Sequence, residues 1–152
     1  MIKTNIEKGD IYYAVLSPVI GSEQGGERPV VVIQNNLGNE YNPTVIVAPL
    51  TKILKKRKLP MHIFIPKNSY LRFDSQVLLE QVRTLDKSRI SNYLGSLNDS
   101  QIQLIDNALI ETFNIDIIRY LRFKGIGGEC SSERKRLYSN YYYKKNWNEY
   151  KC

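Results

Sequence analysis

The stretch GSEQGGERPVVVIQNN, residues 21–36, decides how the rest of the chain is interpreted. It passes from a polar loop with three glycines into a β-branched run at residues 30–33. Such a run is typical of a buried strand. Pro29 restricts its own φ and holds the preceding Arg28 in an extended conformation. Arg28 is therefore expected at the mouth of a rigid strand with its guanidinium over the glycine loop, a suitable place for a phosphate.

Length and composition indicate one domain with a genuine core. The chain has 152 residues, of which 42% are hydrophobic. No apolar run approaches the ~20 residues of a membrane span, and the N-terminus lacks the apolar core of a signal peptide. The cysteines Cys130 and Cys152 lie near the C-terminus and cannot crosslink the core. Whether they pair is open. We expect a soluble cytoplasmic protein with no membrane association.

The positive charge is concentrated in two places. Residues 116–152 hold 9 Lys and Arg against 4 Asp and Glu, whereas residues 1–115 hold 13 against 11, and the whole chain carries +7. Within the first part, basic residues cluster at 52–58, which includes Lys56 and Arg57. A clustered basic loop attracts a polyanion more strongly than the same charge spread evenly. A merely solvated loop is the alternative.

Short β-rich runs separated by turn signals predict a small, mainly β barrel or sandwich. Besides 30–33, the expected strands cover residues 11–16, 44–48, 61–65 and 74–84, with a short edge piece at 93–97 and a turn at 35–39.

One helix is expected to follow the strands. Asn98 and Gln101 have the spacing of a capping box, with Asn in place of Ser or Thr. Ile102, Ile105, Leu109 and Phe113 then share one face, which should pack on the barrel. No Pro or Gly interrupts the pattern before Gly125, so the helix is expected to continue through Ile117, Ile118 and Leu121.

Residues 125–152 differ in character from the rest of the chain. After a glycine-rich linker, the basic runs 134–136 and 144–145 are interleaved with aromatic residues, namely Tyr138, Tyr141, Tyr142, Tyr143 and Trp147. This composition suits phosphate contacts combined with base stacking. The alternatives are an extension that meets a partner or an anionic membrane surface, and a solvated tail.

The residues of this chain exclude several kinds of catalytic chemistry. The one histidine, His62, lies in an apolar strand pattern and is interpreted as structural. No cluster has metal-ligand spacing, and there is no P-loop, dinucleotide fingerprint or nucleophile elbow, so neither a metal nor a cofactor is expected. RNA cleavage fits this inventory, because the ribose 2′-OH supplies the nucleophile and the protein supplies cations and donors.

Several fragments, in order across about residues 7–113, resemble the MazF/PemK family of toxin endoribonucleases. They are GDIY at 9–12, LSP at 16–18, GSEQGG at 21–26, RPVVVIQN at 28–35, PT at 43–44, PLT at 49–51, KLP at 58–60 and LEQVRTLD at 79–86. The chain after about residue 115 departs from this pattern.

The resemblance implies a mainly β fold, a small SH3-like β-barrel with a C-terminal helix, here followed by a basic, aromatic-rich extension. The barrel domain would cover residues 1–115, and residues 116–152 would hold the helix continuation and the tail. It further implies a homodimer that cleaves single-stranded RNA at specific sequences, without a metal, in the cytoplasm. A cognate antitoxin would place a partly disordered, acidic segment in the RNA groove.

By position, Arg28 matches the family's catalytic arginine and Thr51 its catalytic threonine. Positions matching the RNA groove, together with two residues of the basic loop, give the RNA-binding set: Ser22, Glu23, Gln24, Ser75, Gln81, Lys56 and Arg57. A guanidinium is almost never deprotonated near neutral pH. We therefore expect Arg28 to stabilise the charged transition state and Thr51 to hold a phosphate oxygen.

Other interpretations of these residues stay open at this point. Arg28 could form a surface salt bridge with Glu23 or Glu27, and Thr51 could cap a turn. Glu23 is a candidate general base by charge alone. At the level of the whole protein, the alternatives are a non-enzymatic toxin that binds a topoisomerase and an inert RNA-binding module. The cleavage motif and the product ends do not follow from the sequence.

Deleting residues 125–152 is expected to reduce the salt dependence of RNA binding, because fewer basic groups would release counterions from the RNA. The measurement is the slope of log K against log salt concentration for the truncated and full-length proteins. An equal slope in the two proteins would exclude the tail from phosphate contact.

Overall fold

The computed structural model describes residues 5–52, 59 and 61–124. The chain divides into two compact units, Met1–Phe113 and Asn114–Cys152, which we describe separately. The basic tail at 125–152 lies outside the described residues. The assignment of residues 1–115 to one domain and of 116–152 to another stays a prediction.

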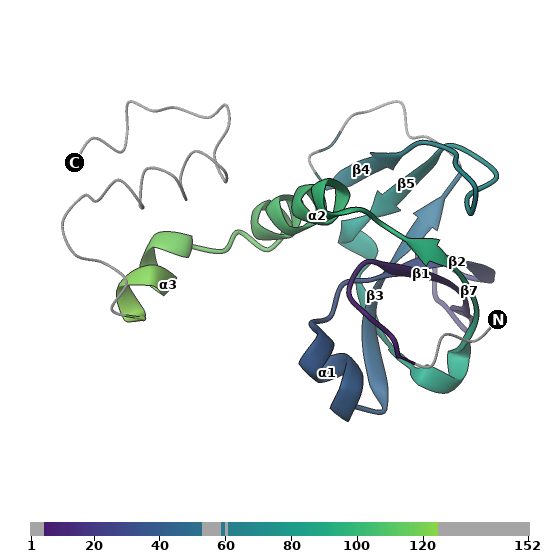
Figure 1. The fold of residues 1–152 in the computed structure, drawn as a ribbon, viewed down its shortest axis with the longest axis horizontal. Helices are drawn as coiled ribbons and strands as arrows, with labels where there is room; N and C mark the ends of the chain where they lie inside the picture. Colours follow the sequence, from purple (N-terminus) through teal and green to yellow (C-terminus); the bar gives the residue numbers. More distant parts are fainter. Residues whose placement is uncertain (1–4, 53–58, 60, 125–152) are drawn as a thin grey trace. The chain divides into compact units, whose positions relative to one another are not determined.

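The first unit is built on a seven-stranded antiparallel sheet (Figure 1). Its strands are β1 (Asp10–Val15), β2 (Glu27–Val32), β3 (Thr44–Thr51), β4 (His62–Ile65), β5 (Ser75–Leu78), β6 (Arg83–Asp86) and β7 (Ile90–Ser96). The strand order is β4-β5-β3-β2-β1-β7, and β6 pairs with the first half of β3. The mainly β prediction is confirmed. The sheet is barrel-like, with no β4–β7 pairing among the described strands.

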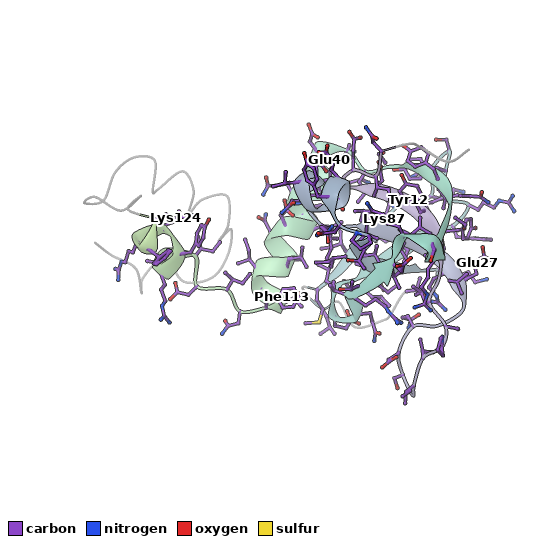
Figure 2. The ribbon with its side chains drawn as sticks, turned by 90° about the horizontal axis from the view of Figure 1, so that it is seen from below. Tyr12, Glu27, Glu40, Lys87, Phe113 and Lys124 are labelled. Carbon is purple, nitrogen blue, oxygen red and sulfur yellow. The ribbon has the colours of Figure 1, made fainter. Side chains whose placement is uncertain are left out.

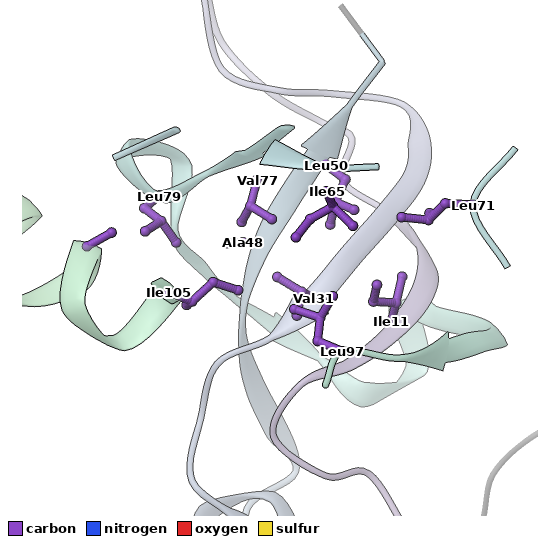
Figure 3. Packing of buried hydrophobic residues seen from close by; sticks show 11 residues of the cluster. Ile11, Val31, Ala48, Leu50, Ile65, Leu71, Val77, Leu79, Leu97 and Ile105 are labelled. Carbon is purple, nitrogen blue, oxygen red and sulfur yellow. The ribbon is translucent and has the colours of Figure 1, made fainter. Parts of the chain in front are cut away.

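Both faces of the central strands are buried, which explains why residues 30–33 show no polar alternation. Val31 packs in one apolar cluster with Ile11, Ala48 and Leu50 (Figure 3). Its neighbours Val30 and Val32 pack in a second cluster with Tyr12, Val47 and Leu85. Successive side chains of a strand point to opposite faces, so a continuous apolar run supplies both clusters. Figure 2 shows Tyr12 within the body, and Glu27 and Glu40 at its margin.

The predicted capping box is confirmed and begins helix α2 (Asp99–Thr112). The Asn98 side chain accepts from the Gln101 N–H at 2.9 Å, and the Gln101 side chain accepts from the Asn98 N–H at 3.0 Å. Ile105 is 2% exposed and joins the first cluster, against which Ile102 and Leu109 also pack. The helix contacts β4 and the turn after β5.

The predicted continuation of this helix is wrong. α2 ends at Thr112, and Asn114 adopts a left-handed φ of 49°, a conformation that Asn tolerates better than most residues. Asp116 then caps a separate helix, α3 (Ile117–Phe123), by accepting from the Arg119 N–H at 2.9 Å. Phe113 is 58% exposed and therefore does not extend the buried face.

Two segments differ from the predicted strands and turns. The expected strand at 74–84 is β5, a 3₁₀ turn η1 (Leu79–Gln81) and β6. The expected turn at 35–39 begins the short helix α1 (Asn36–Tyr41), because the Asn35 side chain accepts from the Gly38 N–H at 2.8 Å. At α1, a short polar side chain that bonds a neighbouring backbone group decides the local structure.

A second 3₁₀ turn, η2 (Lys87–Arg89), connects β6 to β7. The Ser88 hydroxyl donates to Asp86 Oδ1 at 2.6 Å and the Ser88 N–H donates to the same atom at 2.8 Å. These bonds lower the pKa of Asp86 below its ordinary value. Lys87 Nζ donates to the Asn39 carbonyl at 2.6 Å and so ties η2 to α1.

Replacing Asn98 by Ala is expected to lower the free energy of unfolding by about 1 kcal/mol, because the Gln101 N–H loses its acceptor. Asn98→Asp keeps an acceptor at the same position and should stay close to wild type. Urea denaturation of the three proteins makes the comparison. Equal losses in both variants would show that the capping bond is not the cause.

Candidate functional site

The loop between β1 and β2 is ordered by bonds at both ends. Leu16 N–H donates to the Gly26 carbonyl at 3.0 Å, and Gly26 N–H donates to Ser17 Oγ at 2.9 Å. Gly26 has a φ of +76°, which a side chain would disfavour. Arg83 donates to the Leu16 carbonyl at 3.2 Å, and Arg89 donates to the Ser17 carbonyl. The start of the loop is thus bonded to β6 and to η2.

Arg28, the second residue of β2, is held by neutral acceptors. Its Nε donates to the Gly25 carbonyl at 2.8 Å, and its Nη1 donates to Gln24 Oε1. In the described part of the chain, no carboxylate forms an ion pair with Arg28, so the salt bridge to Glu23 or Glu27 is not formed. Glu23 Oε2 instead accepts from the Ile20 N–H at 3.1 Å. The guanidinium is therefore oriented without being neutralised.

The same loop is bonded to η1. The Gln24 N–H donates to Gln81 Oε1 at 3.3 Å, across 57 positions of sequence. Gln24 therefore bonds Arg28 with its side chain and Gln81 with its backbone N–H, and so links the two residues. Three of the residues predicted from the sequence form one connected network.

Thr51 is the last residue of β3, not a residue beyond it. The pairs Val30–Pro49, Val31–Ala48 and Val32–Val47 define the register of β2 with β3. Continuing this register by two residues brings Arg28 opposite Thr51. Both lie an even number of residues from the Val30–Pro49 pair, so their side chains leave the same face of the sheet. The last paired residues are Val30 and Pro49, so the relation of Arg28 to Thr51 is this register extended by two residues, at the adjacent ends of β2 and β3.

Two further residues share the Thr51 face and were missed from the sequence. Thr51 pairs with Gln76 of β5, and Gln76 pairs with Phe64 of β4. Gln76 is 7% exposed and Phe64 is 49% exposed. Gln76 could have been singled out from the sequence, because it is a polar residue next to the apolar run of a predicted strand. Nothing in the apolar run at 61–65 distinguishes Phe64 from a core residue.

The other predicted RNA-binding residues are not gathered in this way. Ser75 precedes Gln76 and so belongs to the opposite face. It is 6% exposed, and its hydroxyl donates to the Phe73 carbonyl at 2.9 Å. Ser22 is exposed in the β1–β2 loop. Lys56 and Arg57 lie outside the described residues.

His62 is buried and contacts the turn that carries Gln81. Its side chain is 1% exposed, and its Nε2 lies 2.9 Å from Glu80 Oε1. Its Nδ1 has no hydrogen-bond partner among the described residues. Nε2 is therefore the nitrogen that interacts with the carboxylate. This contact ties β4 to η1 and agrees with a structural role.

In the part of the chain that the structure describes, no three His, Cys, Asp or Glu side chains are grouped as metal ligands. No helix there is both long enough and apolar enough to cross a bilayer.

A family model described as "PemK-like, MazF-like toxin of type II toxin-antitoxin system" matches residues 7–113. This match covers more than half of the chain and contains the whole network described above. The chain belongs to the PemK/MazF toxin family.

Solved structures with the same fold support the family assignment. MazF from Deinococcus radiodurans superposes with a TM-score of 0.64 at 21% identity, covering 74% of this chain and 100% of that one. An endoribonuclease from a mycobacterial species, solved with its cognate antitoxin, gives 0.61 at 22%, covering 72% and 96%. The Mycobacterium tuberculosis toxin MazF-mt6 gives 0.61 at 22%, covering 70% and 98%. At these identities the likeness is one of fold.

Replacing Gln81 by Leu is expected to speed hydrogen exchange at the Gln24 amide about fivefold, because one hydrogen bond contributes roughly 1 kcal/mol. The Gly26 amide, which is bonded to Ser17, serves as the internal control and should keep its rate. Exchange measured by NMR at both amides tests the link between the loop and η1. An unchanged Gln24 rate would contradict it.

Proposed function

We propose that this PemK/MazF family protein is an endoribonuclease that cleaves single-stranded RNA at specific sequences without a metal ion. The observation that carries the proposal is the placement of an un-neutralised Arg28 and the Thr51 hydroxyl on one face, at neighbouring strand ends. In-line attack by a ribose 2′-OH needs charge stabilisation at phosphorus, and the protein need not supply a nucleophile.

In this proposal Arg28 stabilises the charge that develops on the phosphoryl oxygens. Its bonds to Gly25 and Gln24 use part of a guanidinium that carries five N–H donors. The remaining donors can bind a phosphate, and the fork is already oriented before RNA arrives. A preorganised donor of this kind contributes roughly 3–4 kcal/mol to transition-state stabilisation.

Thr51 is proposed to bind a phosphate oxygen through its hydroxyl. Gln24 and Gln81 then border the RNA path, because their mutual bond places them beside Arg28. Ser22, Glu23 and the basic residues Lys56 and Arg57 are proposed to contact RNA beyond this centre. Ser75 is not included, because its side chain leaves the opposite face.

The proposal extends to partners. An acidic segment of a cognate antitoxin would bind the same cationic face in competition with RNA. The mycobacterial relative was solved in complex with its cognate antitoxin, which supports an antitoxin partner. We also propose that the chain acts as a homodimer in the cytoplasm.

Arg28→Ala and Thr51→Ala are each expected to lower the cleavage rate, by about 10²- to 10³-fold for Arg28, because a transition-state donor is lost. The assay follows cuts in a long single-stranded RNA by primer extension with EDTA present. Arg119→Ala, at an exposed arginine of α3, is the matched control and should cleave like wild type.

Each outcome of this assay has a distinct meaning. Wild-type rates in both variants would remove Arg28 and Thr51 from the active site. RNA that is bound but left intact by the wild type would indicate an inert RNA-binding module. RNA that is neither bound nor cut would favour a toxin that acts on a protein target.

A further inference from the structure

Phe64 lies on the sheet face that carries Thr51, two strands away. The register runs from Thr51 to Gln76 and from Gln76 to Phe64 without a break. Residues opposite one another in paired strands point to the same face. Two strand spacings separate Phe64 from Thr51, which is about 10 Å.

Phe64 is the most exposed residue of β4, in which His62 and Ile65 are buried and Ile63 is partly buried. Ile65 is fully buried in the first cluster and His62 is 9% exposed. Phe64 is 49% exposed and is absent from both apolar clusters. β4 is also an outer strand of the sheet, so one side of the ring is approached without displacing another strand.

We propose that Phe64 is a base-stacking residue that binds a nucleobase next to the phosphate held at Arg28 and Thr51. An aromatic ring on a sheet face is a standard platform for a base of single-stranded nucleic acid. This inference rests on the proposed function and adds a nucleotide subsite to it.

An RNA base is the occupant that the surroundings favour. The face continues directly into Thr51 and toward the cationic Arg28, which lacks a carboxylate partner in the described part of the chain. A polyanion with aromatic rings matches both features at once.

The test measures binding separately from cleavage. A fluorescent 2′-O-methyl oligoadenylate cannot be cut, because the attacking hydroxyl is blocked, and an abasic strand of equal length presents phosphates without bases. Phe64→Leu keeps an apolar side chain but removes the π-face, whereas Phe64→Tyr keeps the ring. Tyr41→Leu is the matched control. Tyr41 is 72% exposed and lies just before the start of β3, whereas Thr51 is at the other end of that strand.

Phe64→Leu is expected to weaken binding of the 2′-O-methyl strand about tenfold, with Phe64→Tyr and Tyr41→Leu close to wild type. Affinity for the abasic strand should be equal in all four proteins. Equal affinity of wild type and Phe64→Leu for the base-containing strand would overturn the proposal. So would a Phe64→Leu protein that loses self-association or antitoxin binding while keeping its RNA affinity.

A second measurement covers the case in which Phe64→Leu does not fold. Irradiation of the wild type with a 2′-O-methyl strand containing 5-iodouracil should yield a crosslink at Phe64, and a crosslink elsewhere only would overturn the proposal. Phe64-dependent binding without RNA cleavage would instead contradict the proposed function and leave the stacking subsite intact.

Discussion

The burial of both faces of β2 is the constraint on which the rest of the structure depends. Val30 and Val32 pack in one apolar cluster, and Val31 packs in the other. A register slip of one residue would exchange the two faces and move every side chain of the strand into the wrong cluster. The pairing of β2 with β3 is therefore fixed by apolar packing. Arg28 and Thr51 acquire their common face from that packing rather than from a bond between them.

The orientation of Arg28 depends on a loop that is itself bonded to β6 and η2. Gly25 and Gln24 accept from the guanidinium, while Arg83 and Arg89 donate to carbonyls at the start of the same loop. Since the acceptors of Arg28 are neutral, its charge is preserved at a surface suited to anions. Support of this kind, from rigid strands and short bonds, is what a site for a charged transition state requires.

The expected secondary structure fails in two places, at η1 and at the end of α2. The strand expected at 74–84 is interrupted by η1, and the interruption brings Gln81 to the β1–β2 loop. The helix expected to run through Leu121 stops because Asn114 adopts a left-handed conformation and Asp116 begins a new helix. The sequence shows Gln81, but not that the Gln24 N–H of the β1–β2 loop is its hydrogen-bond partner.

The sequence by itself determined the mainly β class, the start of α2 at the Asn98 capping box and the family, because these depend on local pattern and on ordered fragments along the chain. It also singled out Arg28, Gln24 and Gln81. Only the tertiary structure decided that these three form one network, that Ser75 faces away, and that Gln76 and Phe64 extend the row from Thr51. Those relations depend on strand register, which is set by contacts between residues far apart in the chain.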